Sequence, residues 1–463
     1  MQNAKNQGKN KNIGRVGMRV YFISLGCDKN LVDSEYMLGL LSEAGHTLTE
    51  DEAEAEAIIV NTCCFIHDAK KESIEAVLEA AGYKETGKCR ILLVTGCLAQ
   101  RYQSEIRAEI PEVDAVLGTA SFDEIVTALQ TAEQGTKPEV YKELDYLPLP
   151  GVKRINTTCG YTAYLKIAEG CEKHCTYCII PSIRGRYRSV PMERVLAEAC
   201  QLAADGAKEL ILVAQETTLY GIDLYGRKAL PELLRKLCAL EGIEWIRLLY
   251  CYPEEITEEL ITVMKEEPKI CRYLDLPIQH AADTVLKRMG RRTTKKELTA
   301  LIRKLRKELP GIVLRTSLIT GFPGETLEEH EELLSFVEKT RFDRLGVFTY
   351  SKEEDTPAAA MKGQIAEKEK RRRQKELMQL QQKIAFENAQ KRIGKRYTAL
   401  IEGKLPQENV YLARTYMDAP NIDGYLFVES EERYESGEFV KVKVTGAKGY
   451  DLMGVNTEKK KII

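Results

Sequence analysis

The feature that most constrains the fold is a regular alternation of short apolar runs and longer amphipathic segments along most of the chain. Apolar, β-branched runs begin near residues 19, 57 and 91, and a helical pattern follows each of them. Strands that alternate with helices at this spacing form βαβ units, whose strands are parallel. The pattern therefore predicts an α/β fold with a parallel sheet in an N-terminal domain at 18–135, followed by a linker at 136–158.

A second strand–helix series begins at Tyr161 and runs to about residue 389. Its six βα units favour a partial or full parallel barrel over a doubly wound sheet, although spacing alone leaves both open. A highly charged stretch from Ile365 to about Arg392 predicts a long, mostly solvated helix that joins two domains. The strands expected in the barrel lie at 163–168, 209–214, 245–250, 273–276, 312–319 and 344–350.

The stretch at 390–457 has a different character. Its short apolar runs are separated by Gly, Pro, Asn and Asp, and short strands at that spacing predict a small antiparallel barrel. We expect a frayed tail at 458–463 and a disordered basic tail at 1–17, because the latter lacks the apolar core of a signal peptide. No run of eighteen apolar residues occurs, which argues against a membrane span.

Charge and cysteine content narrow the possible functions. The 68 Lys and Arg residues nearly balance the 70 Asp and Glu residues, so the chain as a whole is not a general polyanion binder. Its thirteen cysteines need an explanation. Because no export signal is visible, we expect a reducing, cytoplasmic compartment, where metal binding or catalysis explains cysteines better than disulfides do.

Three cysteines form the sharpest motif in the chain, Cys171-x₃-Cys175-x₂-Cys178, just after the first strand of the second series. Thiolates this close in sequence can ligate neighbouring irons of one 4Fe–4S cubane. Three ligands leave the fourth iron open, and an open coordination position allows a metal site to do chemistry. The alternative is a structural zinc site with His174 as the fourth ligand, although His174 would form a cramped chelate.

A second set of cysteines is spread over the N-terminal domain. Cys27, Cys63 and Cys97 each follow the end of an expected parallel strand, at separations of 36 and 34 residues. Loops at one edge of a parallel sheet meet where open α/β folds place ligands, so three thiols can converge there and hold a second cluster. The plainer alternative is that these are buried structural cysteines. Of the neighbours Cys63 and Cys64, only one side chain should face such a site.

The Cys171 motif, with Tyr177 just before its last cysteine, resembles the radical S-adenosylmethionine (SAM) superfamily. The resemblance implies that the open iron binds SAM and that an electron from the cluster cleaves SAM to a 5′-deoxyadenosyl radical. It also implies SAM contacts from Tyr177, from Gln215 and Glu216 after the second strand, and from Gly321 in a later turn. Two plainer interpretations stay open: Glu216 as a neighbour of a helix N-cap, and 321–325 as an ordinary β-turn.

The whole domain order is similar to that of the methylthiotransferase family. This resemblance implies a Rossmann-like N-terminal domain, a radical SAM core at 159–389 with a (β/α)6 partial barrel, and a TRAM domain at 390–457. It implies a second 4Fe–4S cluster on Cys27, Cys63 and Cys97, with Cys63 preferred to Cys64. It further implies that one SAM molecule donates a methyl group to sulfur held at this auxiliary cluster, and that another supplies the radical that activates the substrate carbon.

Segment 24–35, Ser-Leu-Gly-Cys-Asp-Lys-Asn-Leu-Val-Asp-Ser-Glu, resembles the RimO branch of that family. Asp28 and Cys64 depart from the pattern, since they stand where the branch usually has Pro and Gly. The branch modifies the β-carbon of an aspartate in small-subunit ribosomal protein S-twelve. We therefore expect that protein as substrate, free or in the small subunit, an electron donor such as a flavodoxin or ferredoxin, no membrane partner and a monomer. Three further segments resemble the branch: 61–63, 276–280 and 418–424.

Three alternatives remain: a tRNA adenosine methylthiotransferase of the same family, a non-enzymatic iron–sulfur carrier, and an RNA-binding module that uses the terminal barrel. Residues 390–457 contain ten basic and ten acidic side chains, whereas a tRNA-binding barrel is expected to have a positive excess. The acidic run Glu429–Glu435 would complement a basic ribosomal protein, although such a run is more often a solvated loop.

Overall fold

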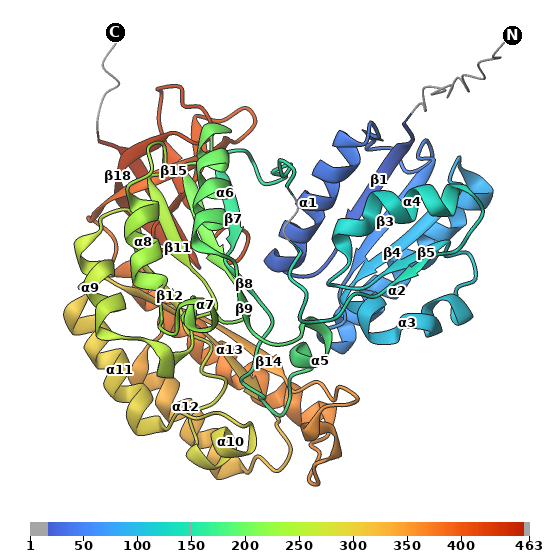
Figure 1. The fold of residues 1–463 in the computed structure, drawn as a ribbon. Helices are drawn as coiled ribbons and strands as arrows, with labels where there is room; N and C mark the ends of the chain where they lie inside the picture. Colours follow the sequence, from blue (N-terminus) through green and yellow to red (C-terminus); the bar gives the residue numbers. More distant parts are fainter. Residues whose placement is uncertain (1–16, 149–150, 458–463) are drawn as a thin grey trace, which may run out of the picture. The chain divides into compact units, whose positions relative to one another are not determined.

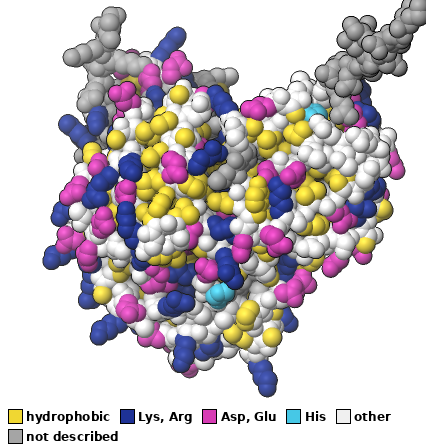
Figure 2. Space-filling view, in the orientation of Figure 1, with side chains coloured by type: hydrophobic (Ala, Val, Ile, Leu, Met, Phe, Trp, Pro, Cys, Tyr) yellow, Lys and Arg dark blue, Asp and Glu magenta, His cyan; other side chains and the backbone are white. Residues whose placement is uncertain are grey.

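The computed structural model describes residues 17–148 and 151–457. The tails expected at 1–17 and 458–463 therefore lie outside it, apart from Gly17. Within these ranges the chain divides into two compact units, one of residues 17–64, 68–143, 148 and 151–155 and the other of residues 65–67, 144–147 and 156–457. No helix in the described ranges is long and apolar enough to cross a membrane. Figure 2 shows basic and acidic side chains interspersed on the face that it displays.

The first unit contains a six-stranded, all-parallel sheet in the order β2-β1-β3-β4-β5-β6 (Figure 1). Every residue of β3 and β4 is buried, as expected for parallel strands covered on both faces. Apolar side chains of α1 and α4 pack on one face of the sheet. The elements are β1 Arg19–Ser24, α1 Asp28–Glu43, β2 Thr47–Leu48, β3 Ala57–Thr62, α2 His67–Thr86, β4 Ile91–Gly96, α3 Cys97–Glu109, β5 Ala115–Leu117, α4 Ile125–Glu133 and β6 Glu139–Val140.

The second unit begins with an open, six-stranded parallel sheet in the order β14-β13-β12-β11-β10-β7. This confirms the expected partial barrel. Its strands are β7 Thr162–Lys166, β10 Glu209–Val213, β11 Trp245–Leu248, β12 Ile270–Asp275, β13 Val313–Thr320 and β14 Arg344–Thr349. The covering helices include α6 Met192–Ala204, α8 Leu230–Cys238, α9 Glu258–Glu266, α11 Lys295–Glu308 and α12 Leu327–Thr340.

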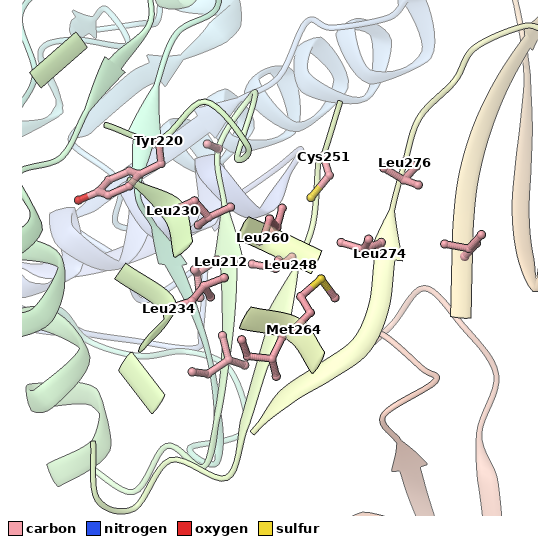
Figure 3. Close-up of a cluster of buried hydrophobic side chains, with 14 of the residues drawn as sticks. Leu212, Tyr220, Leu230, Leu234, Leu248, Cys251, Leu260, Met264, Leu274 and Leu276 are labelled. Carbon is pink, nitrogen blue, oxygen red and sulfur yellow. The ribbon is translucent and has the colours of Figure 1, made fainter. Parts of the chain in front are cut away.

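The core of this sheet is formed by leucines that neighbouring strands point toward the covering helices. Leu212, Leu248 and Leu274 lie side by side on β10, β11 and β12, and Leu234 of α8 and Met264 of α9 pack against them (Figure 3). All five are essentially inaccessible to solvent. Burial of this kind contributes about 1.5–3 kcal/mol per large side chain, so the core holds the strand ends in fixed positions.

Helix α13, Glu367–Gln390, confirms the long helix expected between the core and the terminal domain. It is less solvated than expected, because one face packs on β14 and α12. The buried side chains of that face include Arg373, Leu377 and Ile384.

The terminal domain is a closed five-stranded barrel in the order β15-β16-β17-β19-β18. The expectation of a purely antiparallel barrel was wrong in one detail, since β17 and β19 pair in parallel while the other four pairs are antiparallel. The reason is geometric, because an odd number of strands cannot alternate in direction around a closed ring. The strands are β15 Arg396–Lys404, β16 Val410–Thr415, β17 Leu426–Glu429, β18 Phe439–Lys448 and β19 Asp451–Asn456.

Candidate cluster and cofactor sites

The structure places Cys27, Cys63 and Cys97 at one edge of the first sheet. Cys63 and Cys97 directly follow β3 and β4, and Cys27 follows β1 at the start of α1. The three strands are neighbours in register, with Ser24 opposite Asn61 and Asn61 opposite Thr95. The three loops therefore leave adjacent strands at the same level, which is the position at which open parallel sheets place ligands.

Gly26 brings the first of these loops against Cys63. Its φ of +95° is a left-handed conformation that glycine adopts without strain, and a Cβ atom there would lie 2.8 Å from Cys63 Cβ and 3.0 Å from its Sγ. The Cys63 side chain thus faces the loop that carries Cys27. Ser73 fixes the backbone at Cys63. The Ser73 Oγ accepts from the Cys63 N–H at 2.9 Å and donates to the Cys63 carbonyl at 2.8 Å.

Buried polar side chains of α1 and β3 hold these loops in place, and sequence reasoning assigned them no role. The Asn30 side chain donates to the carbonyls of Leu25 and Thr62, at 2.6 and 3.3 Å. The Asn61 side chain donates to the Asn30 carbonyl at 3.0 Å and to Ser34 Oγ at 2.8 Å. These contacts link α1 to the ends of β1 and β3, so they fix the spacing of the loops that carry the cysteines.

Cys171, Cys175 and Cys178 lie in one loop between β8 (Ala168–Glu169) and α5 (Ile180–Arg184), beyond the carboxyl end of β7. Burial raises the pKa of Cys171 to about 11 and that of Cys178 to about 12. A bound metal would have to stabilise their thiolate forms. In the described ranges no three His, Cys, Asp or Glu side chains are placed to hold one metal ion.

Gln215 and Glu216 follow the carboxyl end of β10, as predicted. Glu216 is fully buried, and this burial raises its pKa to about 8. Its Oε1 accepts the Thr218 N–H at 3.0 Å, whereas Oε2 has no hydrogen-bond partner among the residues described. The next helix begins only at Ile222 and is capped by Gly221, so the structure argues against a helix-capping role for Glu216.

The Gln215 side chain is held by a buried ion cluster that sequence reasoning missed. Its amide donates to Glu169 Oε1 at 2.6 Å. Burial would raise the Glu169 pKa, but Lys166 at 2.9 Å and Arg184 at 3.2 Å hold it well below its ordinary value. Because Glu169 stays ionised, it can fix Gln215 beside the cysteine loop; the partners were missed because they lie up to 46 residues apart.

Gly321 begins a tight turn at the carboxyl end of β13. The Glu325 carboxylate accepts the N–H groups of Gly321 and Phe322. Arg373 of α13 pairs with Glu325 at 3.1 Å, and its Nη1 also donates to the Glu325 carbonyl at 3.0 Å. Burial would raise the Glu325 pKa, but His280, His330 and Arg373 hold it well below its ordinary value. Hydrogen bonds within the turn and the contact with α13 therefore fix its conformation.

Tyr177 is packed against apolar residues of this same region, including Met289 and Phe322. Burial raises its pKa well above the ordinary value. Tyr252, which sequence reasoning also missed, brings its hydroxyl to 3.9 Å from Cys175 Sγ. Tyr177, Gln215, Glu216 and Gly321 thus all lie at the carboxyl end of the second sheet, where parallel barrels place their active sites.

Comparisons with known proteins match all three parts of the chain. Residues 19–118 match a model described as uncharacterized protein family UPF0004, residues 165–337 match the radical SAM superfamily, and residues 393–456 match the TRAM domain. A protein of Lachnoclostridium phytofermentans named ribosomal protein uS12 methylthiotransferase RimO is 65% identical over 94% of this chain and 99% of its own length. A protein of the same name from Clostridium botulinum strain Hall is 51% identical over 95% and 98%.

Among solved structures, the radical SAM methyltransferase TsrM from Kitasatospora setae with cobalamin and a [4Fe–4S] cluster bound has a similar fold. The TM-score is 0.54 at 14% sequence identity, and the match covers 74% of this chain and 77% of that one. At this identity the similarity concerns the fold alone.

Proposed function

The chain belongs to the RimO family of radical SAM methylthiotransferases that act on ribosomal protein uS12, and from this premise we propose how its residues carry out the reaction. The radical SAM domain implies SAM and a 4Fe–4S cluster. The proposal is that Cys171, Cys175 and Cys178 hold this cluster, that Cys27, Cys63 and Cys97 hold a second, auxiliary one, and that the methylthio group goes to the β-carbon of a uS12 aspartate.

The observation that carries this proposal is that each set of three cysteines lies at the carboxyl edge of its own parallel sheet. When bound, the cluster at the second sheet would supply an electron for SAM cleavage, and the auxiliary cluster at the first sheet would carry sulfur. One SAM would be the radical source and another the methyl donor. At the auxiliary site the contact between Gly26 and Cys63 supports Cys63 as the ligand. Cys64 is buried as well, so the choice of Cys63 rests on this contact.

The chain's own residues would bind and orient SAM at the second sheet. Glu216 offers a buried carboxylate oxygen, Oε2, that has no hydrogen bond among the described residues and lies 3.9 Å from Lys173 Nζ. A closer ammonium group, such as that of SAM, would favour its ionised form and lower its pKa. The Gln215 side chain is oriented by Glu169. The ring of Tyr177 and the backbone of Gly321 remain the proposed contacts for the adenine and ribose, because both lie beside Phe322 at the end of β13.

The charges of the terminal barrel support a basic protein as substrate. The net charge of the barrel is zero, but its acidic and basic side chains are concentrated in different segments. Residues 402–438 contain nine acidic and three basic side chains, and this half includes the run Glu429–Glu435. Glu429, Glu431 and Glu435 of this run are exposed and would complement a basic ribosomal protein. Residues 391–401 and 439–448, which contain most of β15 and β18, hold seven basic side chains and no acidic one. This basic pair of strands favours tRNA as the second candidate substrate.

Location and partners form the rest of the proposal. The thirteen cysteines suit the reducing cytoplasm where ribosomal proteins are made, because metal binding or catalysis explains cysteines there better than disulfides do. A flavodoxin or ferredoxin as electron donor and a monomeric enzyme stay predictions, as does the choice between free uS12 and uS12 in the small subunit.

The test supplies the anaerobically reduced enzyme, SAM and sulfide with free uS12, with small subunits or with tRNA, and examines each product by mass spectrometry. We expect a methylthio group on a uS12 aspartate and unmodified tRNA. Methylthioadenosine in the tRNA, with uS12 unchanged in both forms, would contradict the proposal.

A further inference from the structure

The inner face of the second sheet, which points away from the covering helices, is closed at some strands and open at others. Every residue of β7, β10 and β11 is buried, so both faces of these strands are covered. On β13, buried and half-exposed residues alternate instead, and the buried Leu318 belongs to the core beneath the helices. Side chains of a strand alternate between its two faces, so the half-exposed residues of β13 lie on the inner face.

The edge strand β14 continues this open face and carries an exposed aromatic ring on it. Phe348 is 51% exposed although it lies within the strand. Val347 packs in the core beneath the helices, so its neighbours Gly346 and Phe348 face inward. The register places Phe348 beside Ile319 and Gly346 beside Ser317. These four residues form what we call the inner patch.

The fold itself does not require glycine at position 346. The backbone there is not left-handed, and a Cβ atom would meet only the Phe348 ring within 4 Å in the described part of the chain, with Cε2 at an ordinary 3.6 Å. Glycine in the middle of a strand weakens it, and often marks a place where a ligand or another backbone approaches closely. The glycine therefore indicates that something outside the fold lies against this face.

The inner patch is continuous with the proposed SAM contacts. Ile319 belongs to the same apolar cluster as Tyr177 and Phe322. The Phe348 ring leans over Gly346, which is two residues back along β14, so it points into the sheet interior and away from the turn at Gly321. A reacting carbon must come within about 3–3.5 Å of the group that attacks it. The polypeptide around the target carbon must therefore lie beside the SAM contacts, where the inner patch is accessible.

The charges around the inner patch favour a polypeptide over a nucleic acid. None of its four side chains is charged. The two arginines on the same face, nearer the amino ends of β13 and β14, are Arg315 and Arg344. Arg315 pairs with Asp275 at 2.7 Å, and Arg344 pairs with Asp418. Because these cations already have carboxylate partners, the face offers little to a phosphate backbone, whose binding depends on Lys and Arg.

We propose that the inner patch binds the uS12 segment that flanks the target aspartate. An apolar side chain of that segment packs on the Phe348 ring, and its backbone passes close to Gly346, where the missing Cβ atom leaves room. This inference rests on the proposed function, and it adds a substrate-binding surface to the cluster and SAM residues.

The test compares Phe348→Ala, Phe348→Leu and Gly346→Ala with Leu78→Ala, a control on α2 of the first unit whose side chain is 52% exposed. Equilibrium dialysis measures the SAM affinity of the cluster-loaded enzymes. Release of 5′-deoxyadenosine without uS12 measures SAM cleavage, and mass spectrometry measures KM and kcat for uS12. Urea midpoints show whether each variant folds normally.

We expect Phe348→Ala to raise the KM for uS12 about tenfold or more, as loss of an aromatic anchor from an interface does. SAM affinity, SAM cleavage and the urea midpoint should stay at their wild-type values. Gly346→Ala should raise KM about fivefold, because the added methyl group crowds the bound chain, while alanine in a strand does not lower stability. Phe348→Leu should retain most of the affinity, and Leu78→Ala should change nothing.

The inference is overturned if Phe348→Ala leaves the KM for uS12 unchanged, or if it weakens SAM binding instead. A KM rise in Phe348→Leu as large as in Phe348→Ala would indicate stacking on the ring, as a nucleobase does, and would overturn a polypeptide occupant. A normal KM in Gly346→Ala would overturn the close approach of the backbone. Failure of the wild-type enzyme to modify uS12 would contradict the proposed function, and this inference with it.

Discussion

The two ends of the six-stranded sheet in the second unit differ in how completely their buried charged side chains are hydrogen-bonded. Near the amino ends, Glu209 accepts from Arg247 at 2.8 Å and from Arg414 at 2.7 Å, and all three side chains are buried. Near the carboxyl ends, Glu216 and Arg291 keep buried polar atoms that have no hydrogen bond in the described part of the chain, and their nearest opposite charges lie 3.9 and 4.0 Å away. The fully paired network joins the sheet to the terminal barrel. Buried groups without hydrogen bonds instead indicate a site at which a ligand supplies the missing partners.

The largest expected effect comes from breaking the paired end. Glu209→Ala leaves Arg247 and Arg414 buried without their shared carboxylate, and loss of one partner from a buried pair costs about 3–5 kcal/mol. We expect a clear fall in the urea midpoint for unfolding of the second unit. Glu241→Ala, at an exposed glutamate that precedes β11, should leave the midpoint unchanged. Equal midpoints for both variants would show that the network is no structural joint.

A smaller effect is expected at the turn that begins with Gly321. Glu325→Ala removes the acceptor of two backbone N–H groups and the partner of Arg373. Because an unsatisfied buried donor costs about 1–3 kcal/mol, we expect SAM affinity to fall by about tenfold or more in equilibrium dialysis. Glu328→Ala, at an exposed position of α12, is the matched control. Unchanged affinity in Glu325→Ala would separate this turn from the SAM site.

Glu216 tests whether a buried group at the carboxyl end of the sheet both lowers the stability of the fold and binds SAM. Burial raises its pKa from 4.5 to about 8, so the folded state binds more protons than the unfolded state between these values, and stability falls as pH rises from 4.5 to 8. Glu216→Gln should remove this decrease in the cluster-free protein. It should also weaken SAM binding about tenfold, since hydrogen bonds to charged groups contribute about 1.5–3 kcal/mol. A variant with the wild-type pH profile and SAM affinity would remove Glu216 from the site.

The smallest effect is expected at Cys64. Cys64→Gly should retain full iron content, because it is the Cys63 side chain that faces the Cys27 loop. Cys63→Ala, measured by the same iron and sulfide analysis, should lose the auxiliary cluster. Iron lost from Cys64→Gly and retained in Cys63→Ala would reverse the assignment.

Sequence reasoning predicted the parts of the molecule that depend on local patterns. Alternating apolar and amphipathic segments predicted both parallel sheets, and strand ends predicted the edge shared by Cys27, Cys63 and Cys97. It could not predict partners joined only by folding. Glu209 and Arg414 are 205 residues apart, and Arg373 of α13 reaches Glu325 in a turn 48 residues earlier. The parallel pair in the terminal barrel was missed because short strands do not reveal their direction.

The most direct test of the account compares two triple variants purified without oxygen, with iron, sulfide, SAM cleavage and methylthiolated uS12 measured on each. Replacement of Cys171, Cys175 and Cys178 by Ala should leave one cluster and abolish SAM cleavage. Replacement of Cys27, Cys63 and Cys97 by Ala should also leave one cluster, retain SAM cleavage and abolish the methylthiolated product. If the second variant keeps both its full iron content and its methylthiolated product, the assignment of an auxiliary cluster to the first sheet is wrong.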